Sequence, residues 1–203
     1  MIKNIIFDIG NVLMRFDYKT YIKELLGDDE VIEKVNNAIW HSGYWNDLDR
    51  GEPTDKMFQL MLEREPDYKE QITLAFENVG QCCHKTEYAI PWIKELKARG
   101  YQVLYLSNYA ENTMKAGPEA LDFLPYMDGG VFSCYERVIK PDPRIYQIIT
   151  ERYGLVPEEC VFLDDFADNV EAARKHGFNA IQFEDYEQAS RELNKLLSEV
   201  NSN

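Results

Sequence analysis

The chain has 203 residues, of which 45% are hydrophobic and 29% are charged, a composition that fits a globular protein with a sizeable core. Its formal net charge of −14 argues against a nucleic-acid partner, which would favour a basic face. No apolar run reaches the roughly 20 residues of a membrane span, and residues 1–4 lead straight into an expected strand rather than an export signal, so we expect a cytoplasmic protein with no membrane partner. The four cysteines lack a zinc-like spacing and are expected to be reduced thiols.

The first expected strand covers residues 3–8 and is apolar on both faces, as in a central parallel strand. The next comparable run, residues 102–107, starts more than ninety residues later. An ordinary crossover between parallel strands needs only one helix, so a larger unit is inserted between these two strands. Apolar residues at helical spacing and capping residues predict four short helices in this insert, at residues 18–26, 30–40, 68–79 and a segment that Thr54 caps.

Strands and helices alternate after the insert. We expect a helix that Thr86 caps and that closes at Gly100, strands at 130–134, 161–163 and 180–183, helices at 143–154 and about 168–176, and an amphipathic C-terminal helix. This alternation predicts an α/β fold with a Rossmann-like parallel sheet covered on both faces. We therefore expect an α/β core from residues 1–15 and 86–203, and a small helical cap from residues 16–85, inserted after the first strand.

Polar side chains follow these strands in one order along the chain: Asp8, Ser107 with Asn108, Lys140, and Asp164 with Asp165. If the strands are parallel neighbours, these residues meet at the C-terminal edge of the sheet, where open α/β sheets place their ligand sites. Each alone has an ordinary explanation as a turn residue or a surface charge. Two adjacent acids at one strand end repel each other unless a cation lies between them, and three acids suit Mg²⁺, which prefers oxygen ligands.

The segments 7–12, 106–108, 140–141 and 163–169 resemble the signature of the haloacid dehalogenase-like hydrolase superfamily, and the helical insert resembles its first class of cap. Within it, the first and last segments are similar to the bacterial phosphatases that act on α-D-glucose 1-phosphate. The resemblance implies a phosphatase with Mg²⁺ as cofactor and a small phosphorylated metabolite as substrate, such as a sugar phosphate.

Roles for single residues also follow from this resemblance. It implies that Asp8 is the nucleophile that forms an aspartyl-phosphate, that Lys140 neutralises the nucleophile and the phosphate, and that Ser107 and Asn108 hold the phosphoryl group. The implied metal ligands are Asp8, the backbone carbonyl of Gly10, Asp165 directly, and Asp164 either directly or through water.

Gly10 departs from the superfamily pattern, in which most phosphatases have a second aspartate that protonates the leaving group and later activates water. Glycine cannot move a proton, and general acid–base help contributes about 10²–10⁴ in rate. We hypothesise that the substrate has a good leaving group, such as an anomeric sugar oxygen, or that a cap residue such as Asp47 supplies the proton.

Two alternative functions stay open. A metal-independent haloacid dehalogenase would share Asp8, Ser107 and Lys140, because an aspartate can also attack carbon, but it would not need the acid pair at 164–165. A non-catalytic phosphometabolite-binding protein would have kept the fold after losing its acid/base residue. The segment 41–50 is rich in aromatic and polar residues and either covers a sugar ring or only connects two helices. The sequence indicates neither the physiological substrate nor the oligomeric state.

Overall fold

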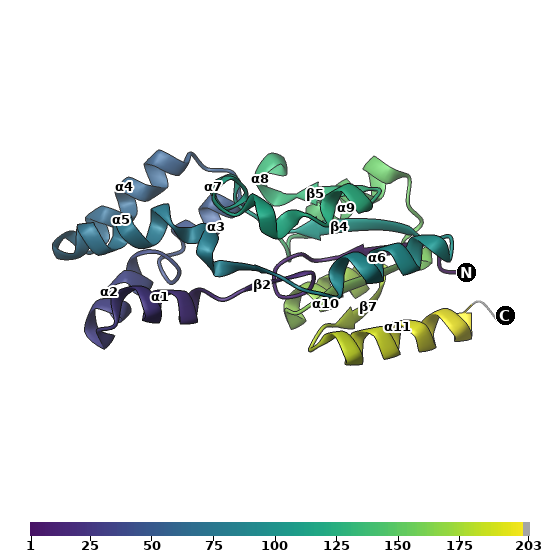
Figure 1. Cartoon of the computed structure of the whole chain (residues 1–203). Coiled ribbons are helices and arrows are strands. Elements are labelled where there is room, and N and C mark those ends of the chain that lie inside the picture. The colour runs from purple at the N-terminus through teal and green to yellow at the C-terminus, as the bar shows by residue number, and fades with distance from the viewer. Residues whose placement is uncertain (201–203) are drawn as a thin grey trace.

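The computed structural model describes residues 1–200, and its centre is a five-stranded parallel sheet (Figure 1). The strand order is β5-β4-β1-β6-β7, so the first strand of the chain lies in the middle, paired in parallel with β4 and β6. This arrangement confirms the predicted α/β fold with a parallel sheet. The strands are β1 (Asn4–Phe7), β4 (Gln102–Ser107), β5 (Gly129–Phe132), β6 (Cys160–Asp164) and β7 (Asn179–Gln182).

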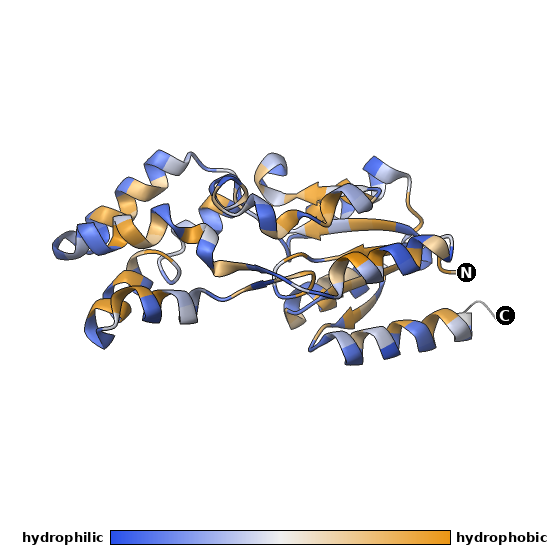
Figure 2. Ribbon diagram, viewed as in Figure 1, coloured by the Kyte–Doolittle hydropathy of each residue, from blue (hydrophilic) through white to orange (hydrophobic). Residues whose placement is uncertain are grey.

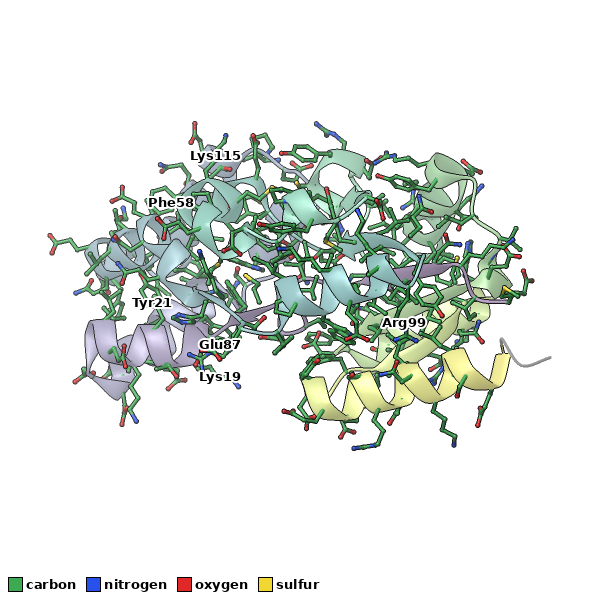
Figure 3. The ribbon with its side chains drawn as sticks, turned by 45° about the vertical axis from the view of Figure 1, so that its right-hand side comes forward. Lys19, Tyr21, Phe58, Glu87, Arg99 and Lys115 are labelled. Carbon is green, nitrogen blue, oxygen red and sulfur yellow. The ribbon has the colours of Figure 1, made fainter. Side chains whose placement is uncertain are left out.

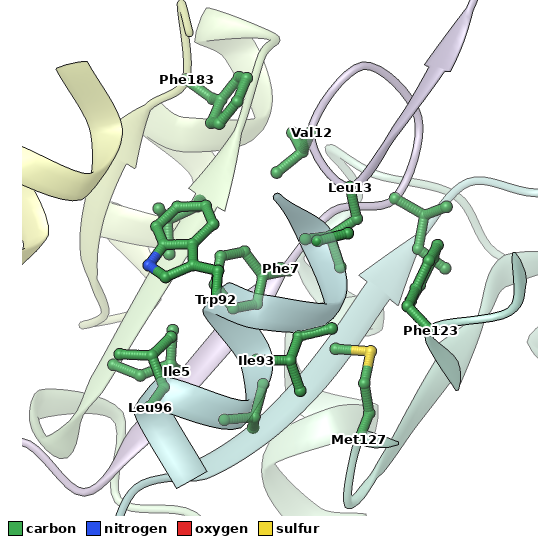
Figure 4. Packing of buried hydrophobic residues seen from close by; sticks show 14 of the residues in the cluster. Ile5, Phe7, Val12, Leu13, Trp92, Ile93, Leu96, Phe123, Met127 and Phe183 are labelled. Atoms are coloured by element: carbon green, nitrogen blue, oxygen red, sulfur yellow. The ribbon is translucent and has the colours of Figure 1, made fainter. Parts of the chain in front are cut away.

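Helices cover both faces of the sheet, because successive residues of each strand point to opposite faces. Phe7 packs with α6 (Ala89–Ala98) and α11 (Tyr186–Val200) in one hydrophobic cluster, whereas Ile6 belongs to a second cluster with α9 (Pro143–Tyr153) and α10 (Ala167–Lys175). In the first cluster, shown in Figure 4, the rings of Phe7 and Trp92 meet edge to face with centroids 4.8 Å apart. Full burial of such a side chain contributes about 1.5–3 kcal/mol to folding.

A helical unit lies between β1 and β4 and is joined to the rest by a short ribbon. The ribbon consists of β2 (Met14–Phe16) and β3 (Cys83–Lys85), which pair antiparallel. The helical unit projects to the left in Figure 1, whereas both chain termini lie at the opposite end. Its helices are α1 (Tyr18–Leu26), α2 (Asp29–Ala38), α3 (Tyr44–Asp49), α4 (Thr54–Arg64) and α5 (Lys69–Glu77).

The helical unit has a hydrophobic cluster of its own. Val35, Met61 and Ile72, from three different helices, are fully buried in it, and Ala110 is a buried member from outside the helical unit. Figure 2 shows hydrophobic residues on the helices of this unit and along the sheet, and alternating polar and apolar turns on α11. The apolar residues of the helical unit are thus buried mainly against one another.

Several helix ends follow the sequence signals. Asp17 caps α1 by accepting a hydrogen bond from the Thr20 amide at 3.0 Å, and Gly27 ends the helix in the left-handed region at φ 70°. Pro143 is in the first turn of α9, which Gly154 ends at φ 61°. These ends were predictable because each depends on one residue type whose backbone preference or side-chain acceptor fits that position.

Other boundaries differ from the prediction. The segment 41–50 is mostly the helix α3, so the insert has five α-helices rather than four. Thr54 is the first residue of α4 and does not cap it with its side chain. The Thr86 hydroxyl donates instead to the Leu13 carbonyl at 2.7 Å, and α6 begins only at Ala89. The Thr86 hydroxyl therefore bonds to a loop carbonyl and does not accept from an amide at the start of α6.

Two further predicted boundaries are wrong, namely the end of the helix at 68–79 and the end of the strand at 130–134. Gly80 does not end α5 but lies in a 3-10 helix, Val79–Cys82, where a Cβ on it would come within 2.0 Å of the Ala116 carbonyl oxygen. The glycine is thus required by close packing rather than by a helix end. The strand predicted at 130–134 stops at Phe132, because α8 (Ser133–Glu136) begins there, and α7 (Glu111–Ala116) follows β4.

Two general features of the described residues concern the cysteines and the apolar character of the helices. All four cysteines are free thiols. Within residues 1–200, no helix has both the length and the apolar character needed to cross a membrane.

Arg99, labelled in Figure 3, donates to Asn194 of α11 at 2.6 Å and so ties the end of α6 to the C-terminal helix.

Candidate active site

A cavity of about 590 Å³ lies at the C-terminal edge of the sheet, between the sheet and the helical unit. Parallel strands bring their C-terminal ends to this edge, which explains why distant segments of the chain meet there. Residues of the sheet side that line the cavity include Asp8, Gly10, Asn108, Lys140, Asp165 and Asp168. Residues of the helical unit and its ribbon that line it include Phe16, Tyr18, Trp40, Trp45, Asp49 and Arg50.

Lys140 is the charged centre of the cavity floor. Its side chain is 1% exposed, and its Nζ lies 2.9 Å from Asp8 Oδ1 and 2.6 Å from Asp164 Oδ2. Burial alone would lower the pKa of Lys140, but the carboxylates of Asp164 and Asp8 outweigh it and raise this pKa, so the lysine is a fixed cation. Burial raises the pKa of Asp8 to about 7, against the opposing effect of Lys140 and with a further increase from Asp164.

Asp164 is fully buried and its carboxylate is occupied by protein donors. It accepts from Lys140, from the Phe166 amide at 2.9 Å, and from the Asn169 side-chain amide at 3.0 and 3.1 Å. Asp165 differs, since the side-chain amide of Asn11 donates to its carboxylate over a long distance, 3.4 Å. Burial, followed by the charge of Asp164, raises the pKa of Asp165 to about 6.

The three acids fit a divalent metal. One carboxylate oxygen from each of Asp8, Asp164 and Asp165 lies within 4.8 Å of the others. Asp8 has its ion pair with Lys140 and its hydrogen bond from the Ile9 amide, 2.7 Å, on the same oxygen, Oδ1, which leaves Oδ2 for another partner. Because Mg²⁺ prefers six oxygen ligands and keeps several waters, Asp8 and the weakly bonded Asp165 are the better ligands, and Asp164 positions Lys140.

Asn108 and Ser107 have different neighbours, because Asn108 contacts the backbone of Lys140 and Ser107 lies near Asp8. The Asn108 side chain forms a reciprocal pair with the backbone of Lys140: its Nδ2 donates to the Lys140 carbonyl at 3.0 Å, and its Oδ1 accepts from the Lys140 amide at 2.8 Å. The Ser107 hydroxyl is buried without a hydrogen bond of normal geometry among the described residues, although it is close enough to favour the charged form of Asp8. The Ser107 hydroxyl is therefore an unpaired hydrogen-bond donor beside Asp8, the candidate nucleophile.

Gly10 is not required by the backbone. Its φ lies outside the left-handed region, and a Cβ built on it meets no atom of residues 1–200 within 4 Å. A side chain at this position would thus fit without strain. The missing carboxylate at position 10 is a chemical property of this site and not a packing constraint.

Asp49 is a site residue that the sequence reasoning missed. It is the last residue of α3, is 8% exposed, and lines the cavity together with Asp8 and Gly10. Burial, and then the charge of Asp8, raise its pKa to about 7. Asp47, the candidate from the sequence, pairs with Arg50 at 3.0 Å and is not among the described residues that line the cavity.

The helical side of the cavity is an aromatic wall, formed by Phe16, Tyr18, Trp40 and Trp45. The rings of Tyr18 and Trp40 stack with centroids 4.9 Å apart, and those of Trp40 and Trp45 lie 5.9 Å apart. The Trp40 Nε1 donor is buried and has no hydrogen-bond partner in the described part of the chain. Buried indole N–H groups normally find a partner, so this donor is an exception among the described residues.

The structure therefore brings most of the predicted site residues together. Asp8, Gly10, Asn108, Lys140 and Asp165 line the cavity. Ser107 and Asp164 are absent from the described lining residues and lie behind it, in contact with groups that do line it.

Comparison with known proteins agrees with this geometry. The sequence model described as "haloacid dehalogenase-like hydrolase" matches residues 2–177. The chain is 26% identical over 215 residues to D-ribitol-5-phosphate phosphatase of Bacteroides thetaiotaomicron, covering 98% of this chain and 100% of that one. It is 27% identical over 197 residues to a sesquiterpene phosphatase of Aspergillus oryzae, covering 96% of each. Other curated relatives are matched over only 12% to 39% of their own length.

Solved structures share the fold. A HAD-family enzyme from Bacteroides thetaiotaomicron, solved in complex with magnesium and inorganic phosphate, superposes with a TM-score of 0.73 and 22% identity, covering 93% of this chain and 99% of that chain. At this identity the likeness concerns the arrangement of the backbone.

Proposed function

This chain belongs to the haloacid dehalogenase-like hydrolase family, and we propose that within it the protein is a Mg²⁺-dependent phosphatase of small phosphate monoesters. The observation that carries the proposal is the buried Lys140 between Asp8 and Asp164, with Asp165 beside them at the cavity floor. This set contains a carboxylate nucleophile, a fixed cation and oxygen ligands for a metal. We also propose that residues 16–85 act as a cap on a core of residues 1–15 and 86–203.

The chemistry assigned to the residues is a double displacement at phosphorus. An oxygen of Asp8 attacks the phosphorus, the bond from phosphorus to the ester oxygen breaks, and an aspartyl-phosphate forms on Asp8. Water then attacks the phosphorus of this intermediate, which releases inorganic phosphate and restores the carboxylate. Lys140 holds Asp8 in place and neutralises charge on the transferred group, while Ser107 and backbone amides near Asn108 hold the phosphoryl oxygens.

Charge explains why a metal is needed. The acids that line or underlie the cavity outnumber its two cations, Lys140 and Arg50, so without a divalent ion the site would repel a phosphate dianion. When bound by Asp8, Asp165 and the Gly10 carbonyl, Mg²⁺ would supply the compensating positive charge and polarise a phosphoryl oxygen.

The cavity wall supports a sugar phosphate such as glucose 1-phosphate as the substrate. Aromatic rings pack well against the apolar face of a sugar ring, and Asn46 and Arg50 offer hydrogen-bond donors to its hydroxyl groups. A prenyl monophosphate is a second candidate, because the same aromatic wall suits an apolar chain and one relative is a sesquiterpene phosphatase. The polar side chains of Asn46 and Arg50 beside the aromatic wall favour the polar substrate.

The first experiment measures phosphate release from glucose 1-phosphate, glucose 6-phosphate, ribitol 5-phosphate and farnesyl phosphate, each with Mg²⁺ and with EDTA. We expect Mg²⁺-dependent release that Asp8→Asn abolishes, and the matched control is Asp67→Asn, which removes an exposed acid of the helical unit. The substrate with the highest kcat/KM identifies the class. Binding of Mg²⁺ and phosphate esters without any turnover would instead support the non-catalytic binding protein, and metal-independent release of halide from 2-haloacids would support the dehalogenase.

A further inference from the structure

The reaction proposed above leaves one chemical step without a residue to carry it. When the ester bond breaks, the leaving oxygen takes up a proton, and when water attacks the aspartyl-phosphate it gives up a proton. Gly10 stands where a second carboxylate would do both, and glycine has no group that titrates. The inference below rests on the proposed phosphatase function and concerns which side chain moves this proton.

We propose that Asp49 of the helical unit is the general acid and general base of this site. It lines the same cavity as Asp8 and Gly10, and it is not one of the three acids whose oxygens converge on a metal position. Its side chain makes no hydrogen bond or ion pair in the described part of the chain, although the residue is only 8% exposed. A buried carboxyl without a partner is costly for the fold, which points to a role toward a bound molecule.

The backbone of Asp49 is held firmly on the core rather than carried loosely by the helices. Its carbonyl accepts a hydrogen bond from the Ser133 hydroxyl at 2.6 Å, and Ser133 Oγ in turn accepts from the Tyr109 amide at 3.0 Å. Two residues further on, Gly51 lies so close to α8 that a Cβ on it would be 2.1 Å from the Cys134 carbonyl oxygen. These contacts fix the end of α3 over the floor of the cavity, as a proton donor requires.

The proton transfers balance over the two steps. Neutral Asp49 gives its proton to the ester oxygen as the bond from that oxygen to phosphorus breaks, and the alcohol leaves. The Asp49 carboxylate then takes a proton from the water that attacks the phosphorus of the aspartyl-phosphate, the bond to Asp8 breaks, and neutral Asp49 is restored. A raised pKa of about 7, caused first by burial and then by Asp8, makes both forms accessible near neutral pH.

The test compares leaving groups in Asp49→Asn, using the metal-loaded full chain and 4-nitrophenyl phosphate beside an alkyl phosphate that the wild type hydrolyses. We expect kcat/KM for the alkyl ester to fall by about 10²–10⁴, because its alkoxide needs a proton. With 4-nitrophenyl phosphate we expect a burst of one equivalent of nitrophenolate, since this leaving group departs unprotonated, followed by slow turnover because water lacks its base. The matched control is Asp55→Asn, an exposed acid in the first turn of α4, which should behave as wild type.

A second variant separates proton transfer from a structural role. In Asp49→Asn combined with Gly10→Asp, the new carboxyl has room at position 10, and we expect turnover of the alkyl ester to recover at least tenfold over Asp49→Asn alone. Equal losses for both esters without a burst, or unchanged activity in Asp49→Asn, would overturn the inference while the phosphatase function stands. Absence of phosphatase activity in the wild type would instead overturn the proposed function itself.

Discussion

Lys140 shows how a single residue decides the electrostatics of the site. Its ammonium is buried with Asp8 at 2.9 Å and Asp164 at 2.6 Å, and Asn108 holds its backbone from both sides of the peptide unit. A buried charge pair contributes little net stability compared with apolar residues of the same shape, but loss of one partner is costly because the other charge stays buried. The lysine is therefore important for keeping these acids in the fold, in addition to the phosphate binding that we propose for it.

The first prediction concerns Lys140→Met. At pH 8 we expect the free energy of unfolding to fall by about 3–5 kcal/mol, because two buried acids lose their cation. The loss should be smaller at pH 5.5, because an acid with a raised pKa is destabilising above that pKa and becomes neutral below it, and the pKa of Asp8 is about 7 even with the lysine present.

Urea denaturation of the metal-free protein at the two pH values measures this difference. The control is Lys175→Met, an exposed residue that pairs with Glu171, for which we expect less than about 0.5 kcal/mol at either pH. An equal loss at pH 8 and pH 5.5 in Lys140→Met would contradict the electrostatic explanation.

A second prediction at this scale is that Mg²⁺ affinity falls as the pH is lowered. Metal binding needs ionised carboxylates, and the pKa of Asp165 is raised to about 6 and that of Asp8 to about 7. Below these values each proton that the metal displaces weakens binding about tenfold per pH unit. Calorimetric titration at pH 7.5 and pH 5.5 tests this, and identical dissociation constants would mean that other groups bind the metal.

At the scale of elements, α3 shows where sequence reasoning stops. Residues 102–107 were predictable as a strand to the residue because a continuous apolar run admits little else. The helix α3 has only six residues, and the residue before it, Gly43, has no side chain that could cap it. The sequence of this segment is equally compatible with a loop that connects two helices. Neither hydrophobic periodicity nor capping could therefore identify it.

The site residues likewise fall into a group that the sequence could predict and one residue that it could not. Asp8, Lys140, Asp164 and Asp165 could be grouped in advance because parallel strands share one edge, and the cavity floor brings them together. Asp49 could not be grouped with them, because its position depends on how the helical unit docks on α8, a contact between elements that carries no local signal. The nearest signal was the glycine at position 51, which has the φ of 79° and the close backbone contact that anchor this end of α3.

The docking of α3 gives a third prediction, for Gly51→Ala. The new Cβ would clash with the Cys134 carbonyl in a backbone conformation that already disfavours alanine, so we expect a loss of about 2–4 kcal/mol in stability and a fall in kcat as Asp49 is displaced. Gly43→Ala is the matched control, because Gly43 has a similar φ of 85° but open space around its Cβ position. It should cost about 1 kcal/mol and leave kcat unchanged. Thermal unfolding and steady-state kinetics on both variants measure this, and equal effects would mean that docking on α8 does not position Asp49.

At the scale of the whole molecule, the net charge of −14 opposes the approach of a phosphate dianion. Salt screens such repulsion over a Debye length of about 10 Å at 0.1 M. With Mg²⁺ saturating, we predict that kcat/KM rises roughly two- to fivefold between 10 and 200 mM KCl, while kcat stays constant, because the long-range field acts on association only. A decrease of kcat/KM with salt, measured on the substrate that the panel identifies, would show instead that the local cations dominate capture.

The ribbon of β2 and β3 has a consequence for how such a chain can change. It holds the two ends of the helical insert as hydrogen-bonded neighbours, with Phe16 opposite Cys83, so the sheet meets the same short span whatever lies beyond it. Two crossovers, one in each strand of the ribbon, would exchange the helical unit with its aromatic residues and Asp49 together and leave Asp8, Lys140 and the acid pair untouched. Under the function that we propose, substrate preference and proton transfer would therefore be exchanged together as one segment, separately from the nucleophile Asp8.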